Sequence, residues 1–373
     1  MFIRHQNLNE EIFMFNKNKK INMELEIFEQ IIIIPQILNS YVNPDSSEIN
    51  IDLPKNIKKI IVVASGSSYH CARFAIDLVE KFSKIETRAI YSSEFLLKNV
   101  IPQDENSLYI FITQSGETSD TLKSIERVKN ETNLPTLCIT NNEDSTIWNL
   151  CDYKIACHAG VENGIAATKS FTAQMLCLIL ISLKLIENTD SEKVTKLLKD
   201  SLFKLPNIIK KAIEKRNEIK KIAKSLAKEK VIVLTADGIS YSLAKEGALK
   251  IKETSYINTS ASILGEFMHG HVAVLNNKKS SLIFISLDKI AERSINNLNK
   301  IKDEYGSNII IIGNPDERVQ YDRSINIECE NELQQLFANI VILQILALEI
   351  AMKLKRNIDN PKGLNKVVVD KII

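Results

Sequence analysis

The sequence has no closely spaced pair of cysteines. Its six cysteines are spread over 373 residues without a CxxC pair, which excludes the usual zinc-binding and thioredoxin-like patterns. We therefore expect no metal site, and we expect buried thiols in a reducing compartment. The cysteines are Cys71, Cys138, Cys151, Cys157, Cys177 and Cys329.

The chain also lacks an excess of one charge and a long apolar run near its amino terminus. It carries 48 Lys and Arg against 46 Asp and Glu, so there is no electrostatic footprint for nucleic acid. The first twenty residues contain no apolar signal-peptide core. The apolar tract Ile31 to Ile34 ends at Pro35 and is far shorter than the roughly 20 residues that span a bilayer. We expect a cytoplasmic protein with no membrane helix.

What the chain does contain is a regular alternation of strand and helix patterns. Hydrophobic residues make up 45% and charged residues 25%, as in ordinary globular proteins, and the length favours two domains. Short Ile- and Val-rich runs such as KKIIVVA, SLYIFI and VIVLTA alternate with amphipathic stretches. This pattern predicts an α/β protein with parallel sheets covered by helices on both faces.

The second half of the chain echoes the first. KKIIVVASGSSYHCARFAIDLVE resembles KVIVLTADGISYSLAKEGALKIKE, with Gly66, Ser68, Tyr69 and Ala72 recurring as Gly238, Ser240, Tyr241 and Ala244. We infer a duplicated fold, followed by a tail in which Pro361 and Gly363 prevent continuation of the last helix. The expected units are an extension and helix at 1–45, a first domain at 46–203, a connecting helix at 204–229, a second domain at 230–356 and a catalytic tail at 357–373.

Two loops that follow strands are rich in hydroxyl groups and glycine. Ligands of doubly wound sheets bind at the carboxyl ends of the strands, and a glycine and hydroxyls beside a helix start suit an anion. The alternative is that these Ser and Thr residues only cap helices. Neither loop has the lysine of a Walker A sequence or three spaced glycines, so a small sugar phosphate fits better than a nucleotide. The loops are Ser65-Gly66-Ser67-Ser68 and Thr113-Gln114-Ser115-Gly116-Glu117-Thr118.

Several other residues are candidates for proton transfer. Glu246, Lys250 and Glu253 share one face of a predicted helix, where they could serve acid-base chemistry or form only a solvated ion pair. His269 lies in a loop bounded by glycines, which is suggestive only. Spacing alone gives no reason to prefer Lys366 over the neighbouring lysines of the tail.

These segments together resemble the sugar isomerase (SIS) family, and within it the isomerase half of the glucosamine-fructose-6-phosphate aminotransferases. The motifs QSGETSDTL, GIAATKSFTAQ, EGALKIKETSYI, GEFMHG and DNPKGLNK occur in the order and approximate spacing of that family. The resemblance runs from about Met23 to the tail. It implies two tandem SIS domains of flavodoxin-like topology and a homodimer in which the His269 loop is shared across the interface.

The resemblance also implies roles for individual residues. Glu253 is expected to move a proton between carbons 1 and 2, His269 to assist ring opening, and Lys366 to form a Schiff base with the open-chain carbonyl. Glu246 and Lys250 are expected to organise the base and the tail, and no cofactor is required. The residues expected to bind the phosphate and the sugar are Ser67, Ser68, Thr113, Gln114, Ser115, Thr118, Ile165, Ala167 and Asn365.

The sequence departs from the family pattern at three positions of the site and at its amino terminus. Ala167 replaces a serine, Asn365 replaces an alanine, and His271 stands where a proline is usual, so the preferred sugar is left open. No glutaminase domain precedes Met23, and we therefore expect that the chain cannot make ammonia from glutamine.

Three functions are compatible with these patterns. The first is an amino-sugar phosphate isomerase of the glucosamine-6-phosphate deaminase or fructosamine-6-phosphate deglycase type, which releases nitrogen from carbon 2. The second is the isomerase subunit of a glutamine-fructose-6-phosphate transaminase that depends on ammonia or on a separate amidotransferase chain. The third is a non-catalytic phosphosugar sensor, although such regulators usually carry a DNA-binding helix-turn-helix, and residues 1–55 show none.

Overall fold

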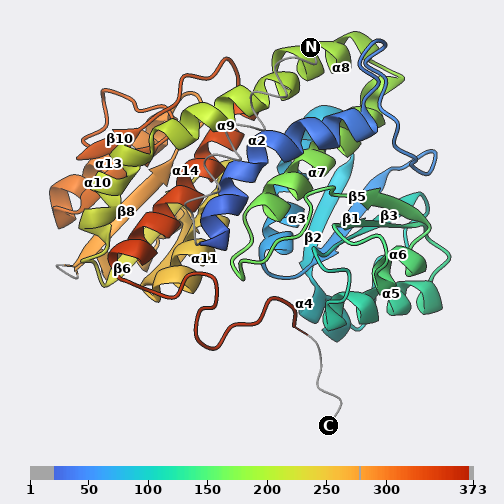
Figure 1. Cartoon of the computed structure of the whole chain (residues 1–373), viewed down its shortest axis with the longest axis horizontal. Coiled ribbons are helices and arrows are strands. Elements are labelled where there is room, and N and C mark those ends of the chain that lie inside the picture. Colours follow the sequence, from blue (N-terminus) through green and yellow to red (C-terminus); the bar gives the residue numbers. More distant parts are fainter. Residues whose placement is uncertain (1–20, 277–278, 369–373) are drawn as a thin grey trace.

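Two five-stranded parallel sheets form the framework of the protein. The computed structural model describes residues 21–276 and 279–368. The first sheet has the strand order β2-β1-β3-β4-β5, and the second has the same order in its own strands, β7-β6-β8-β9-β10. This is the flavodoxin-like order, repeated. The prediction of an α/β protein with two flavodoxin-like domains is therefore confirmed (Figure 1).

The central strands form because their β-branched and aromatic residues fit a sheet that is covered on both faces. Every residue of β3 and of β8 is buried, whereas the edge strands β2 and β7 are partly exposed. The strands are β1 Lys59–Ala64, β2 Glu86–Tyr91, β3 Ser107–Ile112, β4 Thr136–Thr140, β5 Tyr153–Ala156, β6 Val231–Ala236, β7 Asn258–Ile263, β8 Ser280–Ile285, β9 Asn308–Ile312 and β10 Arg323–Ile325.

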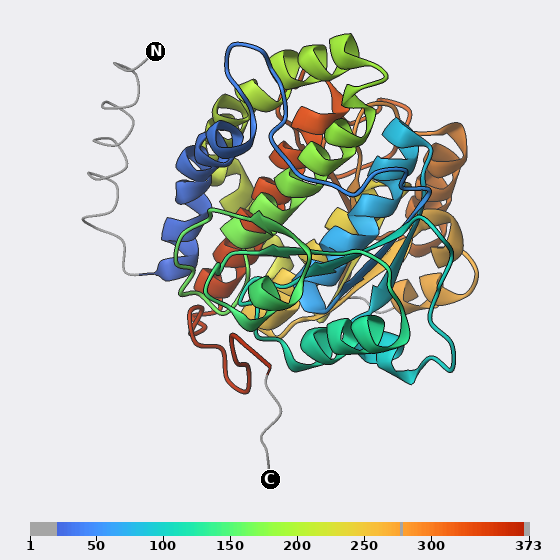
Figure 2. The same ribbon diagram turned by 90° about the vertical axis from the view of Figure 1, so that its right-hand side faces the viewer.

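Five long helices lie between the two sheets and carry most of the apolar core (Figures 1 and 2). Helix α3 of the first domain packs against its counterpart α11 of the second, so residues from both domains meet at this contact. The inner helices are α2 Asn22–Tyr41, α3 Gly66–Ser83, α7 Lys169–Glu187, α11 Ser240–Ser255 and α14 Glu332–Lys353.

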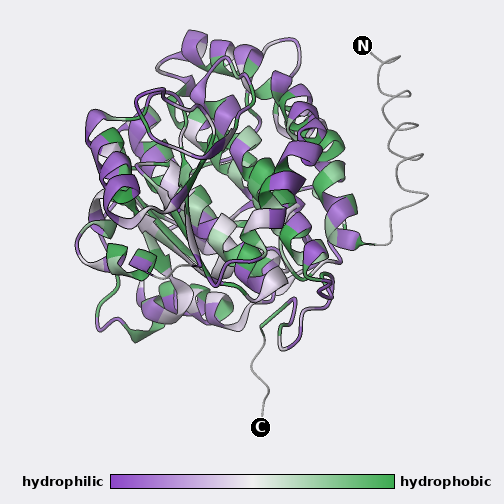
Figure 3. Ribbon diagram, turned by 90° about the vertical axis from the view of Figure 1, so that its left-hand side faces the viewer, coloured by the Kyte–Doolittle hydropathy of each residue, from purple (hydrophilic) through white to green (hydrophobic). Residues whose placement is uncertain are grey.

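The outer helices are amphipathic and bury only one stripe. Figure 3 shows them banded in purple and green, as expected where apolar residues recur every three or four positions. They are α4 Ser92–Leu97, α5 Ser119–Glu131, α6 Thr146–Leu150, α8 Ser191–Asp200, α9 Leu205–Glu214, α10 Arg216–Leu226, α12 Leu264–Phe267 and α13 Glu292–Tyr305, with short 3₁₀ turns η1 Leu202–Lys204 and η2 His271–Asn276.

The connecting segment differs from the single helix expected over 204–229. It consists of α9 and α10, which are separated at Lys215. Arg216 begins α10 directly after this break, and its guanidinium donates to Glu349 of α14 at 2.6 Å and also to Glu24 of α2. The two helices therefore carry an arginine that ties the connection to both inner helices.

Helices α7 and α14 are long and apolar enough to cross a membrane by length and composition alone. However, 83% and 94% of their most apolar windows are buried inside the protein. Core helices between two sheets have the same composition, because they contact apolar side chains on every face.

Candidate functional site

A cavity of about 630 Å³ lies at the carboxyl ends of β1 and β3. The tail that follows α14 runs from there to the first domain (Figure 1). The cavity is lined by twelve of the fourteen residues that the sequence analysis singled out. These are Ser67, Ser68, Thr113, Gln114, Ser115, Thr118, Ile165, Ala167, Lys250, Glu253, Asn365 and Lys366. Glu246 and His269 are the other two, and neither lines this cavity.

The two hydroxyl-rich segments frame one end of the cavity. Ser67 and Ser68 belong to the first turn of α3, and Thr118 immediately precedes α5. Both helix starts present backbone N–H groups that have no partner within their own helix, and such groups attract anions. The arrangement suits a phosphate group.

The helix-capping alternative fails for the two cap residues. Neither Ser65 nor Thr118 makes a side-chain capping bond to its helix. The Thr118 hydroxyl instead lies 2.9 Å from the hydroxyl of Thr113, and the Ser67 hydroxyl donates to Glu246 at 2.9 Å. These hydroxyls therefore belong to the cavity wall rather than to helix caps.

A buried cluster of charges on α11 forms the floor of the cavity. Lys250 Nζ lies 2.7 Å from Glu253 Oε2 and 3.3 Å from Glu246 Oε1, with the side chains of Lys250 and Glu246 1% and 0% exposed. The solvated ion pair considered above is therefore wrong. The Glu253 side chain is 20% exposed and faces the cavity, so it is the carboxylate that a bound molecule can reach.

Burial and ion pairing oppose each other in this cluster. Burial by itself raises the pKa of Glu246, but the Lys250 ammonium and the hydrogen bonds from His70 and Ser67 hold that pKa below its ordinary value. Burial lowers the pKa of Lys250, but Glu246 and Glu253 raise it overall. Both groups are thus charged at neutral pH, and Lys250 is no proton donor.

The tail delivers Lys366 to the opposite wall. Its ammonium donates to Glu162 Oε2 at 2.7 Å and to the Gly164 carbonyl at 2.5 Å. The tail is held in place by Asp359, whose carboxylate accepts from the N–H groups of Asn22 and Met23 at the start of α2. A carboxylate in that position is favoured because it meets unpaired donors and the positive helix end.

Sequence reasoning missed Glu162. This carboxylate is fully buried and accepts bonds from Ser170 Oγ at 2.7 Å and from the backbone of Thr168 at 2.9 Å. Burial raises its pKa, but the Lys366 ammonium and these bonds hold it below the ordinary value. The available signal was its position two residues before the GIAATKS motif.

His70 was missed as well. It lies on α3, and its Nδ1 is 2.7 Å from Glu246 Oε2. Only its place in the SSYH sequence after β1 could have pointed to it. His269, in contrast, follows α12 and is exposed, away from the cavity of its own chain, and its expected role in a neighbouring subunit stays a prediction.

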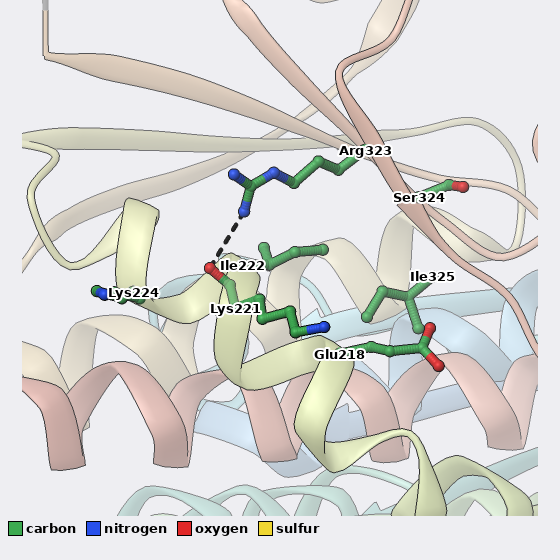
Figure 4. A pocket seen from close by; sticks show the side chains of 7 residues that line it. All are labelled: Glu218, Lys221, Ile222, Lys224, Arg323, Ser324 and Ile325. Atoms are coloured by element: carbon green, nitrogen blue, oxygen red, sulfur yellow. Dashed lines mark hydrogen bonds between the residues drawn. The ribbon is translucent and has the colours of Figure 1, made fainter.

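A second pocket, of about 470 Å³, lies between α10 and β10 (Figure 4). Arg323 donates to the Lys221 carbonyl there at 3.1 Å, and none of the predicted site residues is present. Its lining residues are Glu218, Lys221, Ile222, Lys224, Arg323, Ser324 and Ile325. The cavity at β1 and β3 is therefore the better candidate.

Comparisons with known proteins identify relatives of the whole described chain. A glutamine-fructose-6-phosphate aminotransferase (isomerizing) of Aquifex aeolicus is 30% identical over 92% of this chain. The chain spans only 57% of that relative's length. Among solved structures, the C-terminal domain of glucosamine-fructose-6-phosphate aminotransferase from Francisella tularensis has a TM-score of 0.85 at 28% identity, covering 92% of this chain and 99% of that one.

A glucosamine-6-phosphate deaminase from Thermotoga maritima has the same fold, with a TM-score of 0.73 at 21% identity, covering 93% of this chain and 99% of that one. The family described as SIS domain matches residues 55–183 and 225–354. The first segment contains the strands of the first sheet, and the second segment contains those of the second sheet. The chain therefore belongs to the SIS domain family.

Proposed function

We propose that this chain is an aldose-ketose isomerase of phosphorylated amino sugars that exchanges nitrogen at carbon 2. One observation carries the proposal: a single cavity holds an anion-binding helix start, the partly exposed carboxylate of Glu253 and the amine of Lys366. A phosphosugar isomerase that exchanges nitrogen needs a group to hold the phosphate, a base to move the proton and an amine to form the Schiff base. The relatives named above support the same substrate class.

In the direction of release, the steps balance with water as the only co-reactant. Glu253 removes the proton from carbon 2 of the open-chain amino aldose and returns it to carbon 1. An amine proton passes to the carbonyl oxygen of carbon 1, which leaves a hydroxyl at carbon 1 and an imine at carbon 2. Lys366 adds to this imine and expels ammonia to give a Schiff base on Nζ. Water hydrolyses the Schiff base, yielding the ketose phosphate and the free lysine.

Lys366 must lose a proton before it can add to carbon 2. Glu162 Oε2 lies 2.7 Å from its Nζ and is positioned to hold the ammonium away from the substrate until the proton leaves. Lys250, itself paired with Glu246, holds the Glu253 carboxylate in place on α11. Ile165 and Ala167 line the cavity beside the tail and are proposed to contact the sugar.

The opposite direction is the second candidate, because the Aquifex aeolicus relative is named a glutamine-fructose-6-phosphate aminotransferase (isomerizing). In that direction the cavity needs ammonia, supplied free or by an amidotransferase. We further propose a cytoplasmic homodimer in which His269 completes a neighbouring site and assists ring opening. The exposure of His269 and the six free cysteines support these two points.

The experiment that tests the proposal is incubation of the purified chain with glucosamine 6-phosphate, with ammonia and fructose 6-phosphate followed separately. Equal release of both supports the deaminase reading. Formation of glucosamine 6-phosphate only from fructose 6-phosphate and ammonia supports the synthetic one. If neither reaction occurs, and fructosamine 6-phosphate and galactosamine 6-phosphate also give no product, the proposal is wrong.

A further inference from the structure

A continuous chain of polar contacts links His70 of the first domain to Glu253 in the cavity. His70 Nδ1 is 2.7 Å from Glu246 Oε2, Glu246 Oε1 is 3.3 Å from Lys250 Nζ, and Lys250 Nζ is 2.7 Å from Glu253 Oε2. Ser67 bridges the middle of this chain, donating to Glu246 and accepting from Lys250 at 3.2 Å. His70 itself is 7% exposed and does not line the cavity.

The charges in this chain do not balance without His70. Two carboxylates, Glu246 and Glu253, face one ammonium, Lys250, in an almost fully buried setting. An excess buried charge is costly unless it is neutralised. Histidine is a side chain that can carry a positive charge, and His70 lies against Glu246 at the far end of this chain of contacts.

Two titratable side chains, Tyr69 and Cys71, flank His70 directly on its own helix. On its own helix, Tyr69 meets the ring edge-on at 6.4 Å between centroids, and burial raises the pKa of Tyr69. Burial also raises the pKa of Cys71, which interacts with Glu246 and with Cys177 on α7. On β2, Tyr91 stacks on Tyr69, and burial raises its pKa to about 12. The raised pKa values keep Tyr69, Cys71 and Tyr91 neutral at physiological pH.

The duplication supplies an internal comparison. The positions equivalent to His70 and Glu246, taken at the spacing of Gly66 and Gly238, are Ser242 and Phe74. Both of these are buried, and they cannot form an ion pair. The duplicated fold therefore carries this ion pair at only one of the two equivalent pairs of positions.

We propose that His70 is a positioning residue that acts through Glu246 and Lys250 to keep Glu253 ionised and aimed into the cavity. If His70 no longer donates to Glu246, the Lys250 ammonium is drawn toward Glu246 and away from Glu253. Glu253 then loses the partner that favours its charged form. The effect of His70 on catalysis rests on the proposed function. The coupling of His70 to Glu253 through Glu246 and Lys250 does not.

The test compares His70→Leu, which removes the donor and the charge, with His70→Asn, which keeps an N–H donor without the charge. His158→Asn is the matched control, because His158 is a half-buried histidine remote from this chain of contacts. We expect the acidic limb of the kcat/KM profile of His70→Leu to move up by about one pH unit, which is a tenfold loss on the acid side. The alkaline plateau of His70→Leu stays within twofold of the wild type. The acidic limb of His70→Asn lies between those of the wild type and His70→Leu.

A purely structural role gives a different result, namely a uniform loss at every pH together with a lower Tm, and that outcome overturns the proposal. An unchanged acidic limb in His70→Leu overturns it too. The kcat/KM profiles of the variants can be measured only if the chain turns over a substrate. A second measurement is therefore made without substrate.

Five histidines make the ring signals of His70 identifiable by their loss in His70→Asn. We expect these NMR signals to move in Glu253→Gln and to stay in place in Lys252→Ala, which alters an exposed neighbour on α11. Unmoved signals in Glu253→Gln contradict the coupling. Moved signals in a chain that turns over no amino-sugar phosphate sustain the coupling and reject the proposed function instead.

Discussion

Lys366 Nζ lies 2.7 Å from Oε2 of Glu162, although 204 residues separate the two in the sequence. Glu162 is fully buried, whereas the Lys366 side chain is 24% exposed toward the cavity. The tail lysine is thus held by a carboxylate that solvent does not reach. A bound sugar can approach the ammonium from the open side while Glu162 stays behind it.

The first prediction concerns this lysine. In Lys366→Ala, borohydride reduction in the presence of fructose 6-phosphate is expected to leave no covalent adduct, because the amine that forms the Schiff base is gone. Mass spectrometry of the reduced chain measures the adduct. Lys362→Ala is the control, since Lys362 is an exposed lysine of the same tail, and it should still trap substrate. An adduct that persists in Lys366→Ala assigns the imine to another lysine.

The second prediction concerns the base. Glu253→Gln keeps the shape of the side chain but cannot accept a proton, so kcat should fall by about 10²–10⁴-fold. Binding of glucosamine 6-phosphate, measured by calorimetry, should change little, because the phosphate contacts lie elsewhere. Lys252→Ala, exposed one position earlier on α11, should leave kcat within twofold. Wild-type turnover by Glu253→Gln rules out this carboxylate as the base.

A third prediction separates two glycines of the anion-binding end. Gly66 and Gly116 both have positive φ, +54° and +75°, so alanine at either position costs about 1–2 kcal/mol in backbone strain. At Gly116 a Cβ would also lie 2.1 Å from Ser145 Oγ, whereas the space beside Gly66 is open. Gly116→Ala should therefore unfold at lower denaturant concentration than Gly66→Ala and bind inorganic phosphate more weakly. Equal midpoints for the two variants would falsify the steric argument.

The fourth prediction follows from the lowered pKa of Glu246. A carboxyl group whose pKa is lower in the folded chain than the unfolded value of about 4.3 stabilises the fold above that value. This stabilisation disappears as the pH falls through the lower, folded pKa. The Tm difference between the wild type and Glu246→Gln should thus be constant near neutrality and shrink below about pH 4.3.

Removing Glu246 also leaves Lys250 without one of its two buried partners. Breaking a buried pair typically costs about 3–5 kcal/mol, so the neutral-pH difference should be easily measured by thermal unfolding. Glu266→Gln, at an exposed position, is the control and should differ little from the wild type. A Tm difference for Glu246→Gln that grows toward acid pH would contradict the assignment of a charged, stabilising carboxylate.

The regular patterns of the sequence predict the central strands but not the edges of the sheets. β3 and β8 are continuous buried runs, whereas β7, Asn258–Ile263, has the sequence NTSASI. An edge strand pairs on one side only and is partly exposed, so it requires no apolar run. The break between α9 and α10 at Lys215 is likewise not marked by a proline or glycine in the sequence. The contacts of Arg216 with α2 and α14, which place α10, depend on the tertiary structure.

By itself, the sequence determined the two-domain α/β fold and the segments that meet at the cavity. Strand and helix periodicity and the repeated motif are local properties, and parallel strands bring their carboxyl ends to one edge. Only the tertiary structure decided the electrostatics. Glu162 and His70 acquire their roles from partners 204 and 176 residues away, and the burial that turns the Glu246–Lys250 pair from a surface pair into part of the site exists only once α3 packs on α11.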